Sequence, residues 1–472
     1  MTTLRFHGSA AVLLLPLALF VAVTAMLFIS EAAFDLTGLA AAGVLTLFSG
    51  SLLAKSPSEY WKAAVRGASS ELTGTVVLIL IASGIFSAMM KASGVADGLV
   101  FLGGMLHLTG HAFTVFVLLA SSLMAAATGS SIGTLLAAMP IFFPAGVALG
   151  ADPAMLAGAV LSGAIFGDNL APVSDVTVIS SVTQRFRDGT PADIAGVVRT
   201  RLPYAMTALA VSMPVYAFMG ASRPVSEAAL SGDASALLML VPVAVLIAVA
   251  VRTRDVLMAI SAGAVTGTAT GLLIGRLSFA TIFAADDGRL SGFLISGISN
   301  VSPIILLCVT LFAFTGIVRE AGVPDMMAKA LEAGSAGRPS ALRTELFLSA
   351  ATLVVTTLFA AVTSASVALV GSLTDDIGRA SNVHPYRRSH ILSGLANSLP
   401  VLMPFSAFVL ITMAAVSGLE GAAAVTPFTL MTAAFYPIAL FLVFGFMVLT
   451  GTGRMMETPE PEAAEAKTAT AL

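Results

Sequence analysis

The chain has 472 residues, of which 57% are hydrophobic and 10% are charged, and its mean hydropathy is +0.97. A soluble protein carries about 25% charged residues, because its surface must be hydrated. The composition therefore excludes a water-soluble globular protein and predicts a protein solvated by the lipid bilayer. The net charge of −3 offers no support for a nucleic-acid partner. The single cysteine, Cys308, excludes an internal disulfide framework.

The first apolar stretch follows Arg5 and resembles a secretory signal peptide. Because a second long apolar stretch follows almost at once, we expect an uncleaved first span. A helix needs about 20 apolar residues to cross the hydrocarbon core. The stretches that fit are 11–29, 33–54, 72–90, 112–127, 202–219, 236–251, 256–274, 303–318, 346–370 and 428–449.

Two further stretches, 128–183 and 389–416, are apolar but rich in Gly, Pro, Ser and Thr. They predict broken or re-entrant helices, which are tolerated at membrane depth only where protein buries them or water reaches them. We therefore expect an all-α polytopic membrane protein of roughly 10–12 transmembrane helices.

Basic residues gather in four loops, within 55–66, 185–201, 252–254 and 329–343. The positive-inside rule places these loops and the N-terminus in the cytoplasm. The expected location is the cell (inner or plasma) membrane, with many passes. By this orientation the loop 220–235 faces outward.

Three motifs recur in the same order in the two halves of the chain. The segment 87–99 resembles 315–327, an offset of 228 positions (315 minus 87). AATGSS, with Thr128, matches AVTSAS, with Thr363, at an offset of 235. SGAIFGDNLAPVS at 162–174 matches SGLANSLPVLMPFS at 393–406. Because the first span of this pattern ends outside and its copy ends inside, we expect two inverted-topology repeats, as in secondary transporters.

This pattern predicts five parts of the chain. They are an N-terminal two-span hairpin with its cytoplasmic loop (1–70), a first inverted repeat (71–220), linking spans (221–297), a second inverted repeat (298–453) and a disordered cytoplasmic tail (454–472).

Asp168 and Asp175 are the two charged residues of 154–184, and they lie beside Gly167 and Pro172, where a helix is interrupted. A carboxylate inside a membrane costs at least a few kcal/mol unless it is paired, protonated or bound to a cation. Both are therefore candidate ligands of a transported Na⁺. Asp175 has a structural alternative as the cap of a following helix.

Oxygen-bearing side chains accompany the two acids and recur at matching places in the second repeat. Any single hydroxyl of this kind often serves only close helix packing. As a set, we expect them to line an ion site: Asn169, Ser174, Thr177, Thr128 and Ser131 in the first repeat, and Thr363, Ser366, Asn397 and Ser398 in the second. We interpret Asp375 and Asp376 as a solvated turn and HPYRR (384–388) as a membrane-surface segment. No Arg lies within either broken segment.

These acids suggest exchange by competition. Burial disfavours the charged form of a carboxylate, so protonation becomes accessible near neutral pH. A hard monovalent cation prefers oxygen ligands, and a proton and a cation then exclude each other from one carboxylate. If only loaded states change sides, antiport follows.

The segments TGSSIGT (128–134), AGAVLSGAIFGDNLAPVSDVT (157–177) and HPYRR resemble the NhaC family of sodium/proton antiporters, within the ion-transporter superfamily. The resemblance implies a carrier with two inverted repeats that exchanges Na⁺ for H⁺, with Asp168 and Asp175 as the ion-binding acids. It implies no enzyme activity and no cofactor besides the transported ions, and a homodimer stays open. Asn169, Ala171 and Val176 depart from the usual pattern.

Other functions remain open on the residues alone. One is a Na⁺- or H⁺-coupled carrier of a small organic acid, amino acid or amine, which the many hydroxyl groups would suit. A passive channel is another. An intramembrane aspartyl protease would need Gly-x-Gly-Asp, but Ile165 stands at the first Gly position. The metalloprotease motif His-Glu-x-x-His is absent from the sequence.

Overall fold

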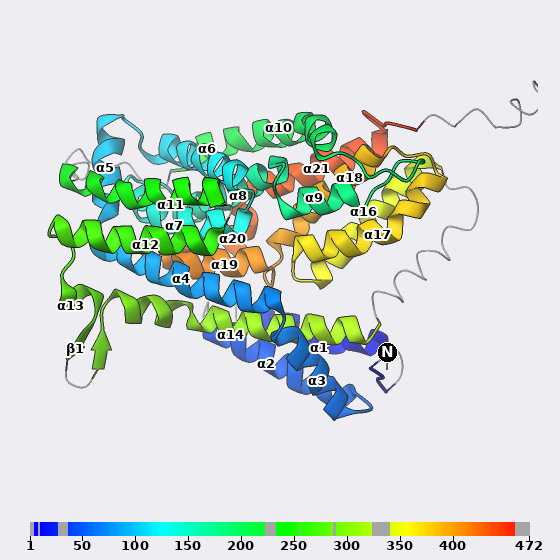
Figure 1. The fold of residues 1–472 in the computed structure, drawn as a ribbon, viewed down its shortest axis with the longest axis horizontal. Coiled ribbons are helices and arrows are strands. Elements are labelled where there is room, and N and C mark those ends of the chain that lie inside the picture. The colour runs from blue at the N-terminus through cyan, green and yellow to red at the C-terminus, as the bar shows by residue number, and fades with distance from the viewer. Residues whose placement is uncertain are drawn as a thin grey trace, which may run out of the picture.

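The computed structural model describes residues 4–7, 10–26, 36–221, 233–253, 255–286, 289–322 and 340–457. Most of the expected tail, most of the loop 220–235 and the basic residues Lys329 and Arg338 lie outside these residues. The described part is helical except for connecting segments and one short antiparallel hairpin, β1 (Ala284–Asp286) with β2 (Arg289–Ser291) (Figure 1).

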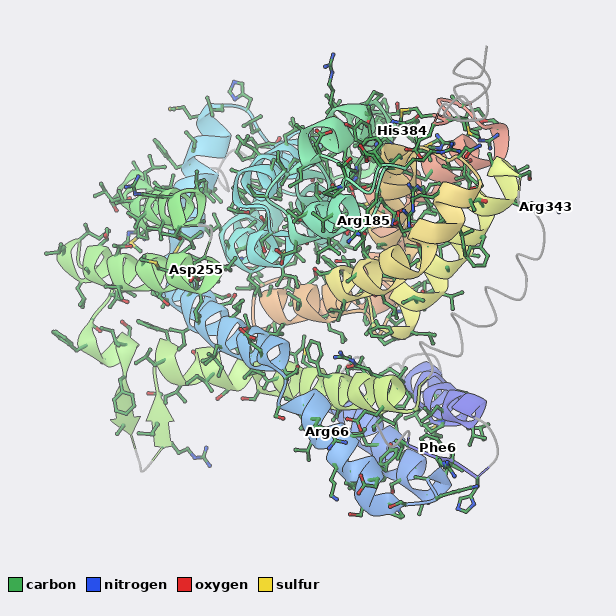
Figure 2. The ribbon with its side chains drawn as sticks, turned by 45° about the vertical axis from the view of Figure 1, so that its right-hand side comes forward. Phe6, Arg66, Arg185, Asp255, Arg343 and His384 are labelled. Atoms are coloured by element: carbon green, nitrogen blue, oxygen red, sulfur yellow. The ribbon has the colours of Figure 1, made fainter. Side chains whose placement is uncertain are left out.

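The N-terminal helices are α1 (Leu14–Ala25), α2 (Leu36–Leu53) and α3 (Pro57–Ala68). Helices α2 and α3 pack on one part of the long helix α14 (Phe293–Glu320), and α1 packs on α2, along the lower edge of Figure 1. Arg66 of α3 forms an ion pair with Glu320 at the end of α14. Figure 2 shows Arg66 in this unit, apart from Arg185 and His384 in the upper bundle.

The first repeat and the linking region supply the next elements in chain order. They are α4 (Glu71–Ser93), α5 (Val95–Met105), α6 (Gly110–Thr128), α7 (Ser131–Ala148), α8 (Pro153–Leu170), α9 (Asp175–Val182), α10 (Ile194–Met219), η4 (Ala234–Met239), α11 (Leu240–Thr253), α12 (Val256–Leu273) and α13 (Phe279–Ile282).

After α14, the second repeat continues with its own series. It comprises α16 (Ala341–Leu358), α17 (Thr363–Ala380), α18 (Pro385–Ala396), η5 (Leu399–Leu402), α19 (Ala407–Val416), η6 (Ala422–Ala424), α20 (Pro427–Ala433) and α21 (Phe435–Thr450).

The two series have the same order of elements and run in opposite directions. Helices α6, α7, α8, α9 and α10 begin 231–233 positions before α16, α17, α18, α19 and α20. Gly421, just after α19, lies against Pro153 at the start of α8. At the other end, Arg388 near the start of α18 bonds Gln184, just after α9. Each broken helix thus begins where the other ends, so the repeats are inverted. The limits expected from sequence, 71–220 and 298–453, stay a prediction.

The number of candidate membrane-spanning helices agrees with the number expected from the sequence. Among the described residues, nine helices are long and apolar enough to cross a bilayer, or eleven if each of two bent pairs counts as one span. The bent pairs are α18–η5 with α19, at 53°, and α20 with α21, at 54°. The chain is therefore a multi-pass, all-α membrane protein with broken helices.

One expected span is wrong. The sequence suggested a single helix over 346–370, but the structure has α16 and α17 joined by a sharp turn at 359–362. That turn, Phe359-Ala360-Ala361-Val362, contains neither Gly nor Pro, so nothing in its composition marks the break. Ala360 and Ala361 adopt positive φ of 51° and 59° there. This conformation costs an L-residue roughly 1–2 kcal/mol.

Two sequence interpretations of charged residues are also wrong. Asp375 lies inside α17 rather than in a solvated turn, and it pairs with the fully buried Arg388 at 2.7 Å. Arg387 is fully buried too, and not at a membrane surface. It pairs with the fully buried Glu345 of α16 at 3.0 Å, and Arg454 contacts the same carboxylate at 2.9 Å. The HPYRR segment therefore holds one end of the second repeat together.

We predict that Glu345→Gln destabilises the protein by on the order of 3 kcal/mol, because Arg387 would remain buried without its counter-charge. Thermal unfolding of the purified protein in detergent would measure the loss. The matched control is Glu59→Gln, which breaks the exposed Lys62–Glu59 pair and should leave the melting temperature close to that of the wild-type protein. Equal melting temperatures for the two variants would contradict this role for Glu345.

Candidate functional site

A cavity of about 160 Å³ lies where the inverted repeats meet. Two hairpin tips reach it, one between α6 and α7 and the other between α16 and α17. Both broken helices reach it as well, together with α4 and the middle of α14. Its polar lining consists of Ser130, Ser131, Asp168, Ser174, Asp175, Thr363 and Ser364, with Cys308 from α14.

Four helices start at this cavity, namely α7, α9, α17 and α19. The first N–H groups of a helix lack partners within it, and the helix dipole makes that end positive. Four such ends favour negative charge in the cavity. The helices that precede them in the chain are α6, α8, α16 and η5, and the carbonyl groups at such C-terminal ends can serve a cation.

Asp168 is the buried acid of the cavity. It lies in the last turn of α8, its side chain is 5% exposed, and it accepts a hydrogen bond of 3.1 Å from Ser131 Oγ. Ser131 is the first residue of α7, so the bond joins one hairpin tip to the broken helix. The tip fits closely, since Gly129, with φ +68°, lies directly against Val173 in the break.

Asp175 differs from the sequence expectation, because it is exposed rather than buried. It is the first residue of α9, and Ser174 is the residue at the cap position. A carboxylate in the first turn is favoured by the helix dipole whatever its function. Asp175 nevertheless lines the same cavity as Asp168, so the structure brings the two acids together.

The remaining predicted residues fall into three groups. Ser131, Ser174 and Thr363 line the cavity beside Asp168. Thr128, Ser366 and Ser398 donate instead to carbonyl groups at Met124, Val362 and Leu395 in their own turns of helix. Asn169, Thr177 and Asn397 do not line the cavity.

Asn397 ends the first half of the second broken helix, at the C-terminus of α18. Its side chain is 1% exposed, and neither amide atom has a hydrogen-bond partner in the part of the chain that the structure describes. A buried polar group without a partner costs roughly 1–3 kcal/mol. Asn397 is therefore available to a ligand or to a different arrangement of the break.

Asn169 and Thr177 face Arg201, which the sequence analysis placed in a cytoplasmic basic loop. Arg201 is fully buried in α10 and contacts both sides of the first break. The broken segments contain no Arg in sequence, but the fold brings this one from α10 against the first of them. One signal could have found it. Asp193 caps α10, which puts Arg201 two turns inside the helix. Tyr386 donates to Asp193 and holds the pKa of that carboxyl below its usual range.

We predict that Gly167→Ala abolishes cation-driven proton flux, because the added methyl group displaces Asp168. Helix α8 packs directly on α6, and a Cβ at position 167 would lie 2.2 Å from the Ser122 carbonyl oxygen. That atom belongs to a helix backbone, so the helices would have to separate. Cation-driven proton flux in proteoliposomes measures the effect. Gly445→Ala in α21 is the control, since nothing lies within 4 Å of its Cβ position. Equal flux in the two variants would contradict the prediction.

Comparison with known proteins supports a transporter. Residues 3–221 match the model of the Na⁺/H⁺ antiporter family. The chain is 31% identical over 176 residues to the Malate-2H(+)/Na(+)-lactate antiporter of Bacillus subtilis, an alignment that covers 37% of this chain and 36% of that protein. It is 28% identical over 280 residues to the Na(+)/H(+) antiporter NhaC of Alkalihalophilus pseudofirmus, covering 54% of this chain and 58% of that protein.

The chain thus aligns with less than two thirds of the length of either relative. Among solved structures, the Alcanivorax borkumensis YdaH transporter aligns at a TM-score of 0.39 and 13% identity, covering 83% of this chain and 88% of that one. That likeness is too distant to match residues. The match to the Na⁺/H⁺ antiporter family model covers residues 3–221, which is less than half of the chain, so membership of the whole chain in this family is a proposal.

Proposed function

We propose that this protein is a secondary active transporter that exchanges Na⁺ for H⁺ by competition at Asp168. The observation that carries the proposal is a buried carboxylate in a cavity where two inverted hairpin tips and two broken helices meet. Such a meeting point is where secondary transporters hold their cargo. The membrane context and the family match make a soluble enzyme site a poor alternative.

The chemistry of the lining suits a monovalent cation. Asp168 supplies an oxygen that can be ionised, and Ser131, Ser174 and Thr363 supply hydroxyl oxygens around the same cavity. Asp175 stands at its more exposed side, where it attracts cations and passes them inward. When a proton occupies Asp168, the carboxyl group loses the charge that holds Na⁺. One site therefore carries either ion and not both.

The inverted repeats provide the two access states. Each repeat contributes one tip and one break, and the two sets point in opposite directions. Exchange of conformation between the repeats would open the cavity first to one side and then to the other. Asn397, which is buried and has no hydrogen-bond partner among the described residues, is a further oxygen ligand for a state in which the second break rearranges.

We place the protein in the plasma membrane with its N-terminus in the cytoplasm, on the basis of its basic loops. The described basic residues Lys55, Lys62 and Arg185 belong to these loops. Reaction of single-cysteine variants at exposed positions with a membrane-impermeant thiol reagent would test this orientation.

We predict that Asp168→Ala and Asp168→Asn abolish Na⁺-dependent proton movement in proteoliposomes loaded with a pH-sensitive dye. Neither variant can exchange a proton at position 168. Asp175→Ala should lose most activity, whereas Asp175→Asn should keep part of it, since an amide retains an oxygen ligand. Asp255→Asn is the control, because this acid caps α12 and is exposed away from the cavity.

Wild-type exchange in both Asp168 variants would remove Asp168 from the mechanism. Wild-type kinetics in Asp175→Asn would favour a purely structural place for Asp175 at the start of α9. A scan of Na⁺, Li⁺ and K⁺ in the same assay identifies the cation.

A second candidate is coupled transport of a small organic acid, and the convergence of four helix N-termini favours it. Such ends bind carboxylate groups through backbone N–H donors. The cavity of about 160 Å³ is large enough for more than a bare cation. Lactate and malate, which the name of one relative includes, are the first probes. Sodium-driven uptake of either would establish this function, and its absence beside working Na⁺/H⁺ exchange would leave ion exchange alone.

A further inference from the structure

The buried guanidinium of Arg201 joins the two halves of the first broken helix. Its Nη1 atom donates to the Asn169 backbone oxygen at 2.7 Å and to the Asn169 side-chain oxygen at 3.4 Å. The same atom donates to Thr177 Oγ1 of α9 at 3.2 Å, and Nη2 lies 3.5 Å from Ser180 Oγ. The contacts thus span the break, from the last turn of α8 to the second turn of α9.

This cation has no ion-pair partner within the described residues, although its side chain is fully buried. Arginine stays protonated in proteins, so the charge is permanent. An unpaired charge inside a membrane costs at least a few kcal/mol and marks a functional position. The acid closest in sequence to a residue that Arg201 contacts is Asp168, which directly precedes Asn169.

The geometry separates Arg201 from the oxygens that would hold cargo. It binds the peptide and side chain of Asn169 but makes no hydrogen bond with the Asp168 carboxylate. Ser131 is the residue that donates to that carboxylate. A positive charge placed this way repels a cation or a proton at Asp168 without occupying its ligand atoms.

Other titratable or charged side chains lie on the elements packed against α10. They are Asp168 on α8, Asp175 on α9, His111 on α6, Tyr386, Arg387, Arg388 and His390 on α18, and Tyr436 on α21. Tyr436 accepts from Asn169 at 3.3 Å, and His390 contacts the Thr200 hydroxyl at 2.8 Å. Arg387 and Arg388 already have carboxylate partners.

We propose that Arg201 is a positioning residue of the transport site, and that it supplies the fixed positive charge that lets Asp168 release its cargo while it holds α8 and α9 together across the break. With Arg201 present, its positive charge balances the negative charge of the ionised Asp168 when no cargo is bound. Without it, Asp168 would hold both H⁺ and Na⁺ too tightly for rapid exchange. The inference rests on the proposed ion-exchange function.

The test compares Arg201→Gln with the wild-type protein in proteoliposomes. We expect at least a tenfold loss of exchange at neutral pH, and the pH of half-maximal activity should rise by roughly one unit. At alkaline pH, where the proton has left, the Na⁺ concentration for half-maximal exchange should fall. A merely structural defect would weaken Na⁺ binding instead. Arg199→Gln, an exposed position on the same helix, should behave as wild type.

A second variant relocates the charge. Asn169 Oδ1 faces the guanidinium, so a lysine at 169 would place its ammonium near the space that Arg201→Gln leaves. We expect Asn169→Lys combined with Arg201→Gln to restore the wild-type pH profile in part. This double variant also keeps the proposal testable if Arg201→Gln alone fails to fold. An unchanged pH profile in Arg201→Gln, or a folded double variant with no recovery, would overturn the proposal.

Failure of this inference can be told apart from failure of the ion-exchange proposal. Infrared titration of the protonated carboxyl band that Asp168→Asn removes follows Asp168 without any transport. If the wild-type protein exchanges no Na⁺ for H⁺, the functional proposal fails, but the Arg201→Gln titration should still move to higher pH. If exchange works and that titration does not move, the role of Arg201 is wrong.

Discussion

An ionised carboxylate loses most of its hydration when it enters the low-dielectric interior of a membrane protein, and the surroundings of Asp168 compensate for that loss. The starts of four helices converge on its cavity, Ser131 donates a hydrogen bond to it, and Arg201 places a permanent positive charge one residue away. In the proposed exchange, the balance among these contributions sets how firmly the carboxylate holds a proton or a metal ion. An acid in plain hydrocarbon would simply stay protonated.

The duplicated scaffold explains how these contributions come together. Corresponding helix starts recur 231–233 positions apart, so the counterpart of Thr363 is Ser131, and the motif match of Thr128 with Thr363 was wrong by three positions. Ser131 and Thr363 begin equivalent helices, and both line the cavity. The chemistry is not duplicated, because Asp175 at the start of α9 corresponds to Ala407 at the start of α19. The first repeat therefore provides the charge, and the second provides uncharged polar groups such as Thr363 and Ser364.

The features that could be predicted from the sequence are those that internal repetition and composition reveal. Polar or Gly/Pro-rich segments in an apolar chain predicted both broken helices, and Asp168 was recognisable because its neighbours are apolar. Arg201 and Arg387 were missed for the opposite reason. Each stands at the end of an apolar stretch, where a charge resembles a surface residue, and only the packing of α10 and α18 shows that each is fully buried. The turn between α16 and α17 was missed because alanines form it.

The contact between α6 and α8 limits how the site can move. Two glycines of α8, Gly163 and Gly167, lie directly against the backbone of α6 and the Cβ atoms of Ser121 and Ala125. This close contact favours movement of the two helices as one unit. In the proposed alternating-access cycle, the α6–α7 tip would then move with Asp168, and the carboxylate would keep its serine partner.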